Sequence, residues 1–211
     1  MRSLASMPSY RIAPPKFIAG ARCLDFLNTV EWRGDPASRG ERLTSYDELL
    51  VWAEAAGYMT PAERRRLLAR AARNLRQARA VVREAVRIRD ALARLLASPD
   101  EDATRSLAVF NRLLQGIPFE FRLERTDGAM RRIPVGGGDS LRRPLDRIIL
   151  DAIDLVTSPR LRSIGRCGND RCGWFFLDES RNRSRRWCDM AACGNTAKVR
   201  AHRQRLGARR R

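Results

Sequence analysis

Apolar residues recur every three or four positions through the middle of the chain, which is the spacing of an amphipathic helix. The longest such pattern runs from Thr60 to about Ala97, with a break near Asn74, and Thr60-Pro61-x-Glu63 is typical of a helix start. Its apolar stripe comprises Leu68, Ala71, Leu75, Ala78, Val81, Ala85, Ile88, Leu92 and Leu95. We expect the stripe to pack inside the chain, and a seam between the two copies of a homodimer is the alternative.

Other segments show the same helical spacing. Ser45 and Glu48 predict a capping box at the start of a helix that ends near Gly57. The remaining predicted elements are a short strand or turn leading into a helix within 17–32, a loop over 33–43, and helices over 102–115 and 141–157.

The period changes from helical to alternating after residue 118. Phe119, Phe121 and Leu123 alternate with charged residues, and Asp127-Gly128 has turn chemistry. These features predict a β-hairpin over 118–135. The fold class is therefore α+β and mainly α.

Changes in composition and the positions of prolines divide the chain into three predicted parts. Residues 1–16 form a flexible arm, 17–159 a mainly helical regulatory or sensor domain, and 160–211 a small basic module beginning after Ser158-Pro159. The last part holds 15 Lys or Arg against 4 Asp or Glu, a balance of +11 out of a net charge of +18. Such a concentration of positive charge indicates a polyanionic partner.

Several classes of protein are not favoured by the sequence. No stretch is long and apolar enough to span a membrane, and the first residues lack the apolar core of a signal peptide. A cytoplasmic, reducing location follows, in which clustered thiols favour metal over disulfides. We find no nucleophile–base pair, and the only histidine is His202, so we do not expect an enzyme.

Four cysteines form two C-x4-C pairs separated by 15 residues: Cys167, Cys172, Cys188 and Cys193. Four thiolates are a typical ligand set for a structural Zn2+, and the intervening segment is long enough for a hairpin that brings the pairs together. Two disulfides or four unrelated thiols are the alternatives. The fifth cysteine, Cys23, lies in an apolar run and is expected to be a buried core thiol.

The residues around these cysteines suit a metal-binding finger. Gly168-Asn169-Asp170 offers small residues that tolerate left-handed backbone, and 174–177 reads as a short aromatic strand. Asn195 is predicted to cap a basic helix over 196–205. The arginines expected to offset the charge of a four-thiolate centre are Arg166, Arg171, Arg185 and Arg186.

The detailed motif resembles the CGNR zinc finger family. It comprises Cys167-x4-Cys172-Gly173-Trp174-x-Phe176-x-Asp178, Ser184-Arg185-Arg186-Trp187-Cys188-x-Met190-x-x-Cys193-Gly194-Asn195, Ala197-Lys198 and His202-Arg203. Phe17, Gly20, Leu24-Asp25-x-x-Asn28-Thr29 and the helix over 49–52 are also similar to the domain that usually precedes this finger.

This resemblance implies a bacterial transcription regulator linked to stress, with the four cysteines as the metal ligands. It also implies an architecture of a helical N-terminal domain with one β-hairpin followed by a treble-clef-like, four-cysteine finger and a basic C-terminal helix. Thr196 departs from the family, which has arginine there. That arginine serves either a phosphate contact or local packing.

We therefore expect a zinc-containing protein that binds nucleic acid, DNA rather than RNA, with an N-terminal domain that senses a signal or self-associates. The expected nucleic-acid contacts are Arg185, Arg186, Lys198, Arg200, Arg203 and Arg205. One alternative is RNA binding, in which aromatic residues of the finger stack on unpaired bases. Another is a redox sensor that releases zinc on oxidation without binding specific DNA.

Overall fold

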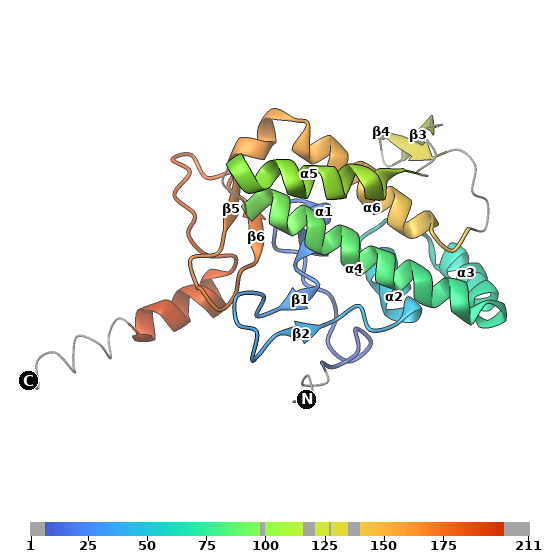
Figure 1. The fold of residues 1–211 in the computed structure, drawn as a ribbon, viewed down its shortest axis with the longest axis horizontal. Helices are drawn as coiled ribbons and strands as arrows, with labels where there is room; N and C mark the ends of the chain where they lie inside the picture. Colours follow the sequence, from blue (N-terminus) through green and yellow to red (C-terminus); the bar gives the residue numbers. More distant parts are fainter. Residues whose placement is uncertain (1–6, 98–99, 116–120, 127, 135–139, 201–211) are drawn as a thin grey trace, which may run out of the picture.

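The computed structural model of the protein shows a mainly helical α+β fold, which confirms the predicted class (Figure 1). The residues that the structure describes are 7–97, 100–115, 121–126, 128–134 and 140–200. The main helices are α1 (Arg22–Leu27), α2 (Tyr46–Ala55), α3 (Pro61–Arg73), α4 (Leu75–Ala97), α5 (Asp100–Leu114) and α6 (Arg143–Val156). The strands pair as antiparallel hairpins: β1 (Val30–Glu31) with β2 (Gly40–Glu41), β3 (Phe121–Thr126) with β4 (Ala129–Pro134), and β5 (Ile164–Arg166) with β6 (Phe175–Leu177).

The long helical pattern divides where the sequence predicts. Thr60 and Glu63 form a complete capping box at the start of α3, with each side chain bonded to the other residue's backbone N–H. Asn74 separates α3 from α4, and its Oδ1 accepts the N–H of Gln77 in the first turn of α4. Because Asn side chains compete for nearby backbone groups, Asn74 both ends one helix and starts the next.

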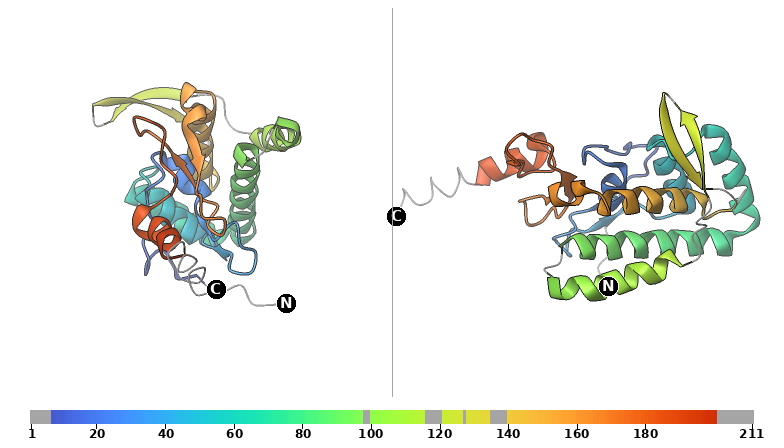
Figure 2. Two further views of the ribbon diagram at one scale, coloured as in Figure 1. Left: turned by 90° about the vertical axis from the view of Figure 1, so that its left-hand side faces the viewer. Right: turned by 90° about the horizontal axis from the view of Figure 1, so that it is seen from above.

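Helices α4 and α5 lie side by side along one face of the molecule, and α1 lies between α4 and α6 (Figures 1 and 2). Ala78, Val81, Ala85 and Ile88 of the α4 stripe are buried in the same core as α1 and α6. Most of the stripe therefore packs inside the chain, whereas Leu75 is 59% exposed, and self-association stays a prediction.

Two predictions for the N-terminal half were wrong in detail. The segment 33–43 contains strand β2, which pairs with β1. The capping box at the start of α2 is incomplete: Ser45 accepts the N–H of Glu48, but the Glu48 carboxylate accepts the N–H of Tyr10 at 2.9 Å instead of closing the box. The N-terminal segment thus contacts α2, a long-range contact that local patterns do not encode.

The predicted hairpin is present as β3 and β4, joined through Gly128 at φ +77°. Residues 118–120, 127 and 135 of the predicted range lie outside the described residues. The hairpin lies toward the end of the molecule away from the zinc-finger sequence, next to the start of α6 (Figure 2). Cys23 is a buried core thiol, as expected.

Strand β6 belongs to two apolar clusters at once. Successive residues of a strand face opposite sides. Phe175 and Leu177 therefore join the helical core, whereas Phe176 packs with the four C-terminal cysteines. The N–H of Leu177 also donates to the oxygen of Ala19 at 2.6 Å. The finger is thus packed on the helical part through its own central strand, while the domain boundary predicted near residue 160 stays a prediction.

Candidate metal centre and basic helix

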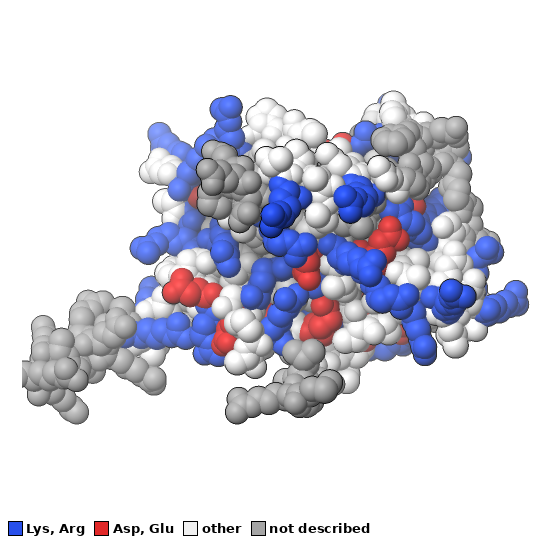
Figure 3. Space-filling model, in the orientation of Figure 1, with Lys and Arg blue, Asp and Glu red and all other residues white. Residues whose placement is uncertain are grey.

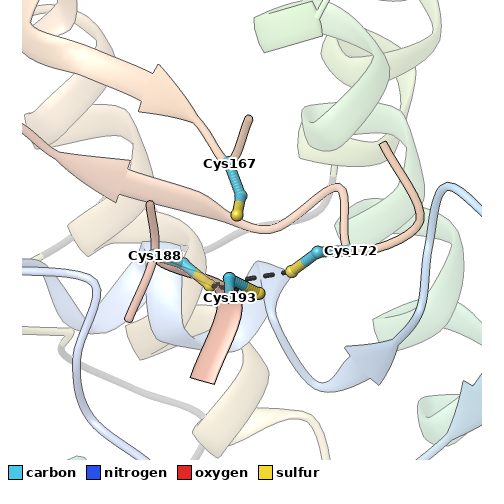
Figure 4. Close-up of side chains that lie close together, drawn as sticks. All are labelled: Cys167, Cys172, Cys188 and Cys193. Carbon is cyan, nitrogen blue, oxygen red and sulfur yellow. Dashed lines mark hydrogen bonds between the residues drawn. The ribbon is translucent and has the colours of Figure 1, made fainter. Parts of the chain in front are cut away.

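The four C-terminal cysteines converge on one buried point (Figure 4). Cys167 follows β5 directly, and Cys172 lies in the turn before β6. Cys188 and Cys193 come from the segment that follows β6, and Cys193 lies in the helical turn Met190–Gly194. The hairpin between the two pairs therefore brings them together, as the spacing predicts.

The positions of the sulfur atoms suit a tetrahedral metal ion. All four Sγ atoms lie within 4.8 Å of one another, with 3.6 Å between Cys172 and Cys188 and 3.7 Å between Cys188 and Cys193. A tetrahedral Zn2+ with bonds of about 2.3 Å separates its sulfur ligands by about 3.8 Å. The five cysteines of the chain are free, and these separations are far longer than the ~2.05 Å of a disulfide bond. The side chains thus fit zinc, and the disulfide alternative does not apply.

The electrostatics of the cluster also favour a cation. Hydrogen bonds from the thiols of Cys172 and Cys188 lower the pKa of Cys167, and donating to that thiolate raises the pKa of both donors. The thiols alone therefore favour one negative charge, because further thiolates at this separation repel one another in a buried site. A bound dication offsets that repulsion and allows all four to ionise.

Backbone hydrogen bonds shape the turn that holds the first cysteine pair. The N–H of Cys167 donates to the oxygen of Trp174, and that of Cys172 donates to the oxygen of Asn169, both at 2.8 Å. The Asn169 side chain is buried, and its Nδ2 lies 3.7 Å from Sγ of Cys193 in the other pair. Within this turn the left-handed backbone occurs at Gly173, with φ +66°, and not at the small residues 168–170 that would also tolerate it.

The second cysteine pair is held by a capped helical turn. The Asp189 carboxylate accepts the N–H of Ala191 at 2.8 Å, and the turn Met190–Gly194 continues directly into a helix over 195–200. Asn195 therefore lies inside the helix, where its Nδ2 donates to the oxygen of Ala191. The prediction that Asn195 caps this helix was wrong, because Asp189, six residues earlier, occupies the N-cap.

Arg185 joins the finger to the rest of the chain. Its guanidinium donates to four backbone oxygens, those of Ile18, Leu177, Trp187 and Cys188. It also lies 4.5 Å from the ring centroid of Phe176. A guanidinium has five N–H groups in all, so these bonds use most of its donors. Its contact with nucleic acid stays a prediction, but the geometry favours a structural role.

A second joint connects the first cysteine pair to the loop between β1 and β2. The Arg171 guanidinium forms an ion pair with Asp35 at 2.7 Å and lies over the ring of Trp32. The Gly34 N–H donates to the Arg171 oxygen, and a Cβ at Gly34 would lie 1.7 Å from the oxygen of Asp170. Glycine is thus required where this loop touches the metal-binding turn.

Three of the remaining predicted nucleic-acid contacts lie on the outside of the finger, within the described residues. Arg186, Lys198 and Arg200 are not buried, and Arg186 lies 5.6 Å from the ring centroid of Trp187. Arg203 and Arg205 lie outside the described residues, and their roles stay predictions. The helix over 195–200 projects from one end of the molecule (Figures 1 and 2).

Sequence reasoning missed the residues that dock the finger. The carboxamide of Asn28 bonds to both backbone groups of Phe175, and the indole N–H of Trp174 donates to the oxygen of Val30 at 2.7 Å. The buried Asp25 carboxylate accepts the N–H groups of Ile18 and Ala19. The only sequence signal was the polar pair at 25 and 28 inside an apolar segment.

Comparisons with known proteins agree with this arrangement. The sequence model of the CGNR zinc finger matches residues 163–206, and that of the ABATE family, described as "Putative stress-induced transcription regulator", matches residues 20–159. No curated protein matches the chain. Among the described residues, no helix is long and apolar enough to cross a membrane.

Proposed function

The chain belongs to the ABATE family and carries a CGNR zinc finger after that domain, and on this premise we propose that it is a zinc-dependent DNA-binding transcription regulator. In this proposal Zn2+ is held by Cys167, Cys172, Cys188 and Cys193. The helical domain receives a signal or mediates self-association. The two family descriptions name a regulator and a zinc finger, and we assign the chain no catalytic role.

The observation that carries the proposal is the basic helix built directly onto the metal centre. Cys193 lies in the turn that continues into the helix bearing Lys198 and Arg200, so the metal fixes where that helix begins. A projecting basic helix is the element that many DNA-binding proteins place in the major groove, where its cations contact phosphates. Basic side chains are also spread over the face formed by α4 and α5 (Figure 3), which favours attraction of a polyanion.

Salt-dependent binding of the zinc-loaded full chain to a labelled DNA duplex tests the proposal. Replacing Lys198 and Arg200 by alanine together should weaken binding and make the log–log salt slope shallower by about 0.9 for each phosphate that the variant no longer neutralises. The matched control replaces Arg65 and Arg70, two arginines of α3 at the opposite end of the molecule. A slope near zero for the wild-type protein, or equal effects of both double variants, would overturn the proposal.

The structure does not favour the stacking mode of RNA binding. Phe175 and Phe176 are buried, and Trp174 and Trp187 are partly buried against the cysteine cluster. Phe176, Trp174 and Trp187 therefore form the small core of the finger and Phe175 belongs to the helical core, so these rings are poorly placed to stack on unpaired bases. Competition between duplex DNA and structured RNA for binding to the protein checks the preference for DNA. Tighter binding of the RNA would contradict that preference.

The redox alternative has its own test, because it does not require DNA binding. Oxidation of the zinc thiolates would release the metal, and metal binding and folding are coupled in such small modules. All four cysteines are buried, which limits access by peroxide. Zinc release at moderate peroxide, measured with a chelating dye, would support redox sensing, and retention of the metal would exclude it.

A further inference from the structure

A cavity of about 360 Å³ lies between the N-terminal segment and the metal-binding finger. Tyr10, Pro14 and Pro15 contribute to one wall, and the wall on the finger side includes Cys172, Cys188, Cys193 and Ala192. The volume falls within the range of about 300–1,000 Å³ that is usual for small-molecule sites. An occupant of this cavity would contact both the arm and the finger.

Most of the aromatic surface of the cavity is held in place before any ligand binds. Trp32, Trp52 and Trp174, three of the four tryptophans, line it together with Tyr10. The indole of Trp174 is fixed by its bond to Val30, and Trp52 packs against the rings of its neighbours in the core. Fixed aromatic walls favour a flat, apolar ligand because stacking then costs little ordering entropy.

Trp32 adds an unusual backbone conformation at the edge of this cavity. Its φ is +51°, a left-handed value that is strained for a bulky L-residue, and the residue is 38% exposed. Residues held in such conformations are concentrated at ligand clamps and active sites. In this conformation the indole lines the cavity and lies under the guanidinium of Arg171 of the finger.

Arg42 supplies a charged group with unused hydrogen-bonding capacity. Its side chain is 7% exposed; Nη2 donates to the oxygen of Ala13 at 2.6 Å, and Nη1 lies 3.4 Å from the Glu31 carboxylate. Its Nε has no hydrogen-bond partner, and among the described side chains with such an atom Arg42 is the one that lines this cavity. A buried N–H left unpaired is unfavourable, and a ligand oxygen that accepts it would remove this penalty.

The carboxylates around the cavity differ in how fully they are already hydrogen-bonded. Asp25 is bonded to two backbone N–H groups, and Asp189 caps the turn of the second cysteine pair, so both are already used. Glu31 forms a long contact with Arg42, its one polar contact within the described part of the chain, and its side chain is 32% exposed. An anionic ligand group would displace Glu31 from Arg42, and Lys16 at the cavity adds a second positive charge.

We propose that this cavity binds a small aromatic carboxylate, with its ring between Trp32, Trp174 and Tyr10 and its carboxylate on Arg42. Bound there, the ligand links the N-terminal segment to the turns that hold Cys172 and Cys193, so that occupancy stiffens the metal-binding finger. The signal received by the regulator is then a small aromatic carboxylate, and this cavity is its binding site. Its regulatory meaning rests on the proposed function, but binding itself does not.

Calorimetric titration of the zinc-loaded full chain tests the site. Nucleic acid is left out, because a failure of DNA binding then cannot be confused with a failure of ligand binding. The probes are 2-naphthoate and its neutral match 2-naphthamide. We expect one naphthoate per chain and at least tenfold weaker binding of the amide. Absence of naphthoate binding, or equal affinity for the two probes, would overturn the proposal.

Two variants that keep the fold locate the site. Trp32→Gly relieves the positive φ and removes one aromatic wall, and it should lower naphthoate affinity at least fivefold. Glu31→Gln removes the competing carboxylate and should tighten naphthoate binding without affecting naphthamide. Phe121→Ala, an exposed aromatic residue of β3, is the matched control and should leave affinity unchanged. No change in Trp32→Gly, or weaker binding in Glu31→Gln, would refute the assignment.

Zinc transfer to a chelator tests whether the occupied cavity adjoins the finger. Naphthoate at saturation should slow transfer at least threefold in the wild-type protein and should have a smaller effect in Trp32→Gly. An unchanged transfer rate at saturation would contradict the placement of the ligand against the metal-binding turns.

Discussion

The side-chain amide of Asn28 bonds to both backbone groups of Phe175, with Nδ2 donating to the oxygen at 2.8 Å and Oδ1 accepting the N–H at 2.9 Å. Asn28 directly follows α1, and Phe175 begins β6, so the bonds join the helical core to the finger. The carboxamide thus forms the two bonds with Phe175 that the backbone of a neighbouring strand would form at the start of β6. Both residues are buried, so water cannot replace these bonds.

Asn28→Ala should lower the free energy of unfolding by about 2 kcal/mol or more, because it leaves two buried backbone groups of Phe175 unpaired. It should also speed zinc transfer to a chelator, since the metal-binding turns lose their support from α1. Denaturant unfolding and chelator kinetics measure the two effects. Asn182→Ala, at an exposed position, is the matched control and should stay within about 0.5 kcal/mol of wild type. Equal stability of the two variants would contradict this role.

Gly34→Ala should separate the β1–β2 loop from the metal-binding turn. The added Cβ would lie 1.7 Å from the oxygen of Asp170, which is a backbone atom that cannot rotate away. We expect a loss of more than about 2 kcal/mol in the free energy of unfolding, measured by denaturant titration. Gly57→Ala separates this clash from simple backbone strain, because Gly57 has φ +81° but open space around its Cβ position. It should cost only about 1 kcal/mol, and a similar cost for both variants would refute the clash.

Replacing a single metal ligand should abolish the finger and spare the helical core. Cys193→Ser should reduce bound zinc from one per chain to none, measured by metal analysis of the purified protein, because a four-thiolate site seldom survives loss of a thiolate. Cys23→Ala is the control, since Cys23 is buried in the helical core and belongs to no thiol cluster among the described residues. It should keep one zinc per chain. Zinc retained by Cys193→Ser would remove this cysteine from the ligand set.

Local patterns predicted the elements well where a single segment carried all the information. The cap at Thr60, the break at Asn74 and the thiol cluster each depend on residues close in sequence or on a repeated cysteine spacing. Local patterns failed where a residue distant in sequence determines which hydrogen bonds a side chain forms. Glu48 leaves its own helix to bond the arm at Tyr10, and Arg185 turns inward to four backbone oxygens.

The helix cap predicted at Asn195 shows a second limit of prediction from local sequence. Asn195 has the composition of an N-cap, but Asp189 begins the helix earlier because the turn Met190–Gly194 is wider than an α-helical turn. Sequence periodicity assumes a fixed pitch and cannot detect such a turn. The turn still carries Cys193 into the metal centre, so the sulfur cluster forms as predicted although the local structure does not.

Asp146 should make stability depend on pH in an unusual direction. Burial raises its pKa to about 6, an effect that Arg142 opposes and Glu84 reinforces, whereas an unfolded aspartate has a pKa of about 3.9. The unfolded chain therefore loses this proton first, and the contribution of Asp146 to stability falls as pH rises from about 4 to about 6. Asp146→Asn should gain stability relative to wild type across that interval, measured by denaturant unfolding at several pH values. A difference that does not change with pH would contradict the raised pKa.

Thr196→Arg should strengthen DNA binding, because it restores arginine at the position where this chain departs from its family. Thr196 is exposed and its Oγ1 donates only to the oxygen of Ala192, one turn back in the same helix, so the substitution disturbs no packing among the described residues. The longer side chain would project beside Lys198 and Arg200 and add one phosphate contact. The log–log salt slope should steepen by about 0.9. Thr157→Arg supplies the control: Thr157 is also exposed and bonds the oxygen four residues before it, but it follows α6, outside the finger. If both arginines raise affinity equally, total charge rather than the finger helix governs binding, and the face assigned to DNA would have to be abandoned.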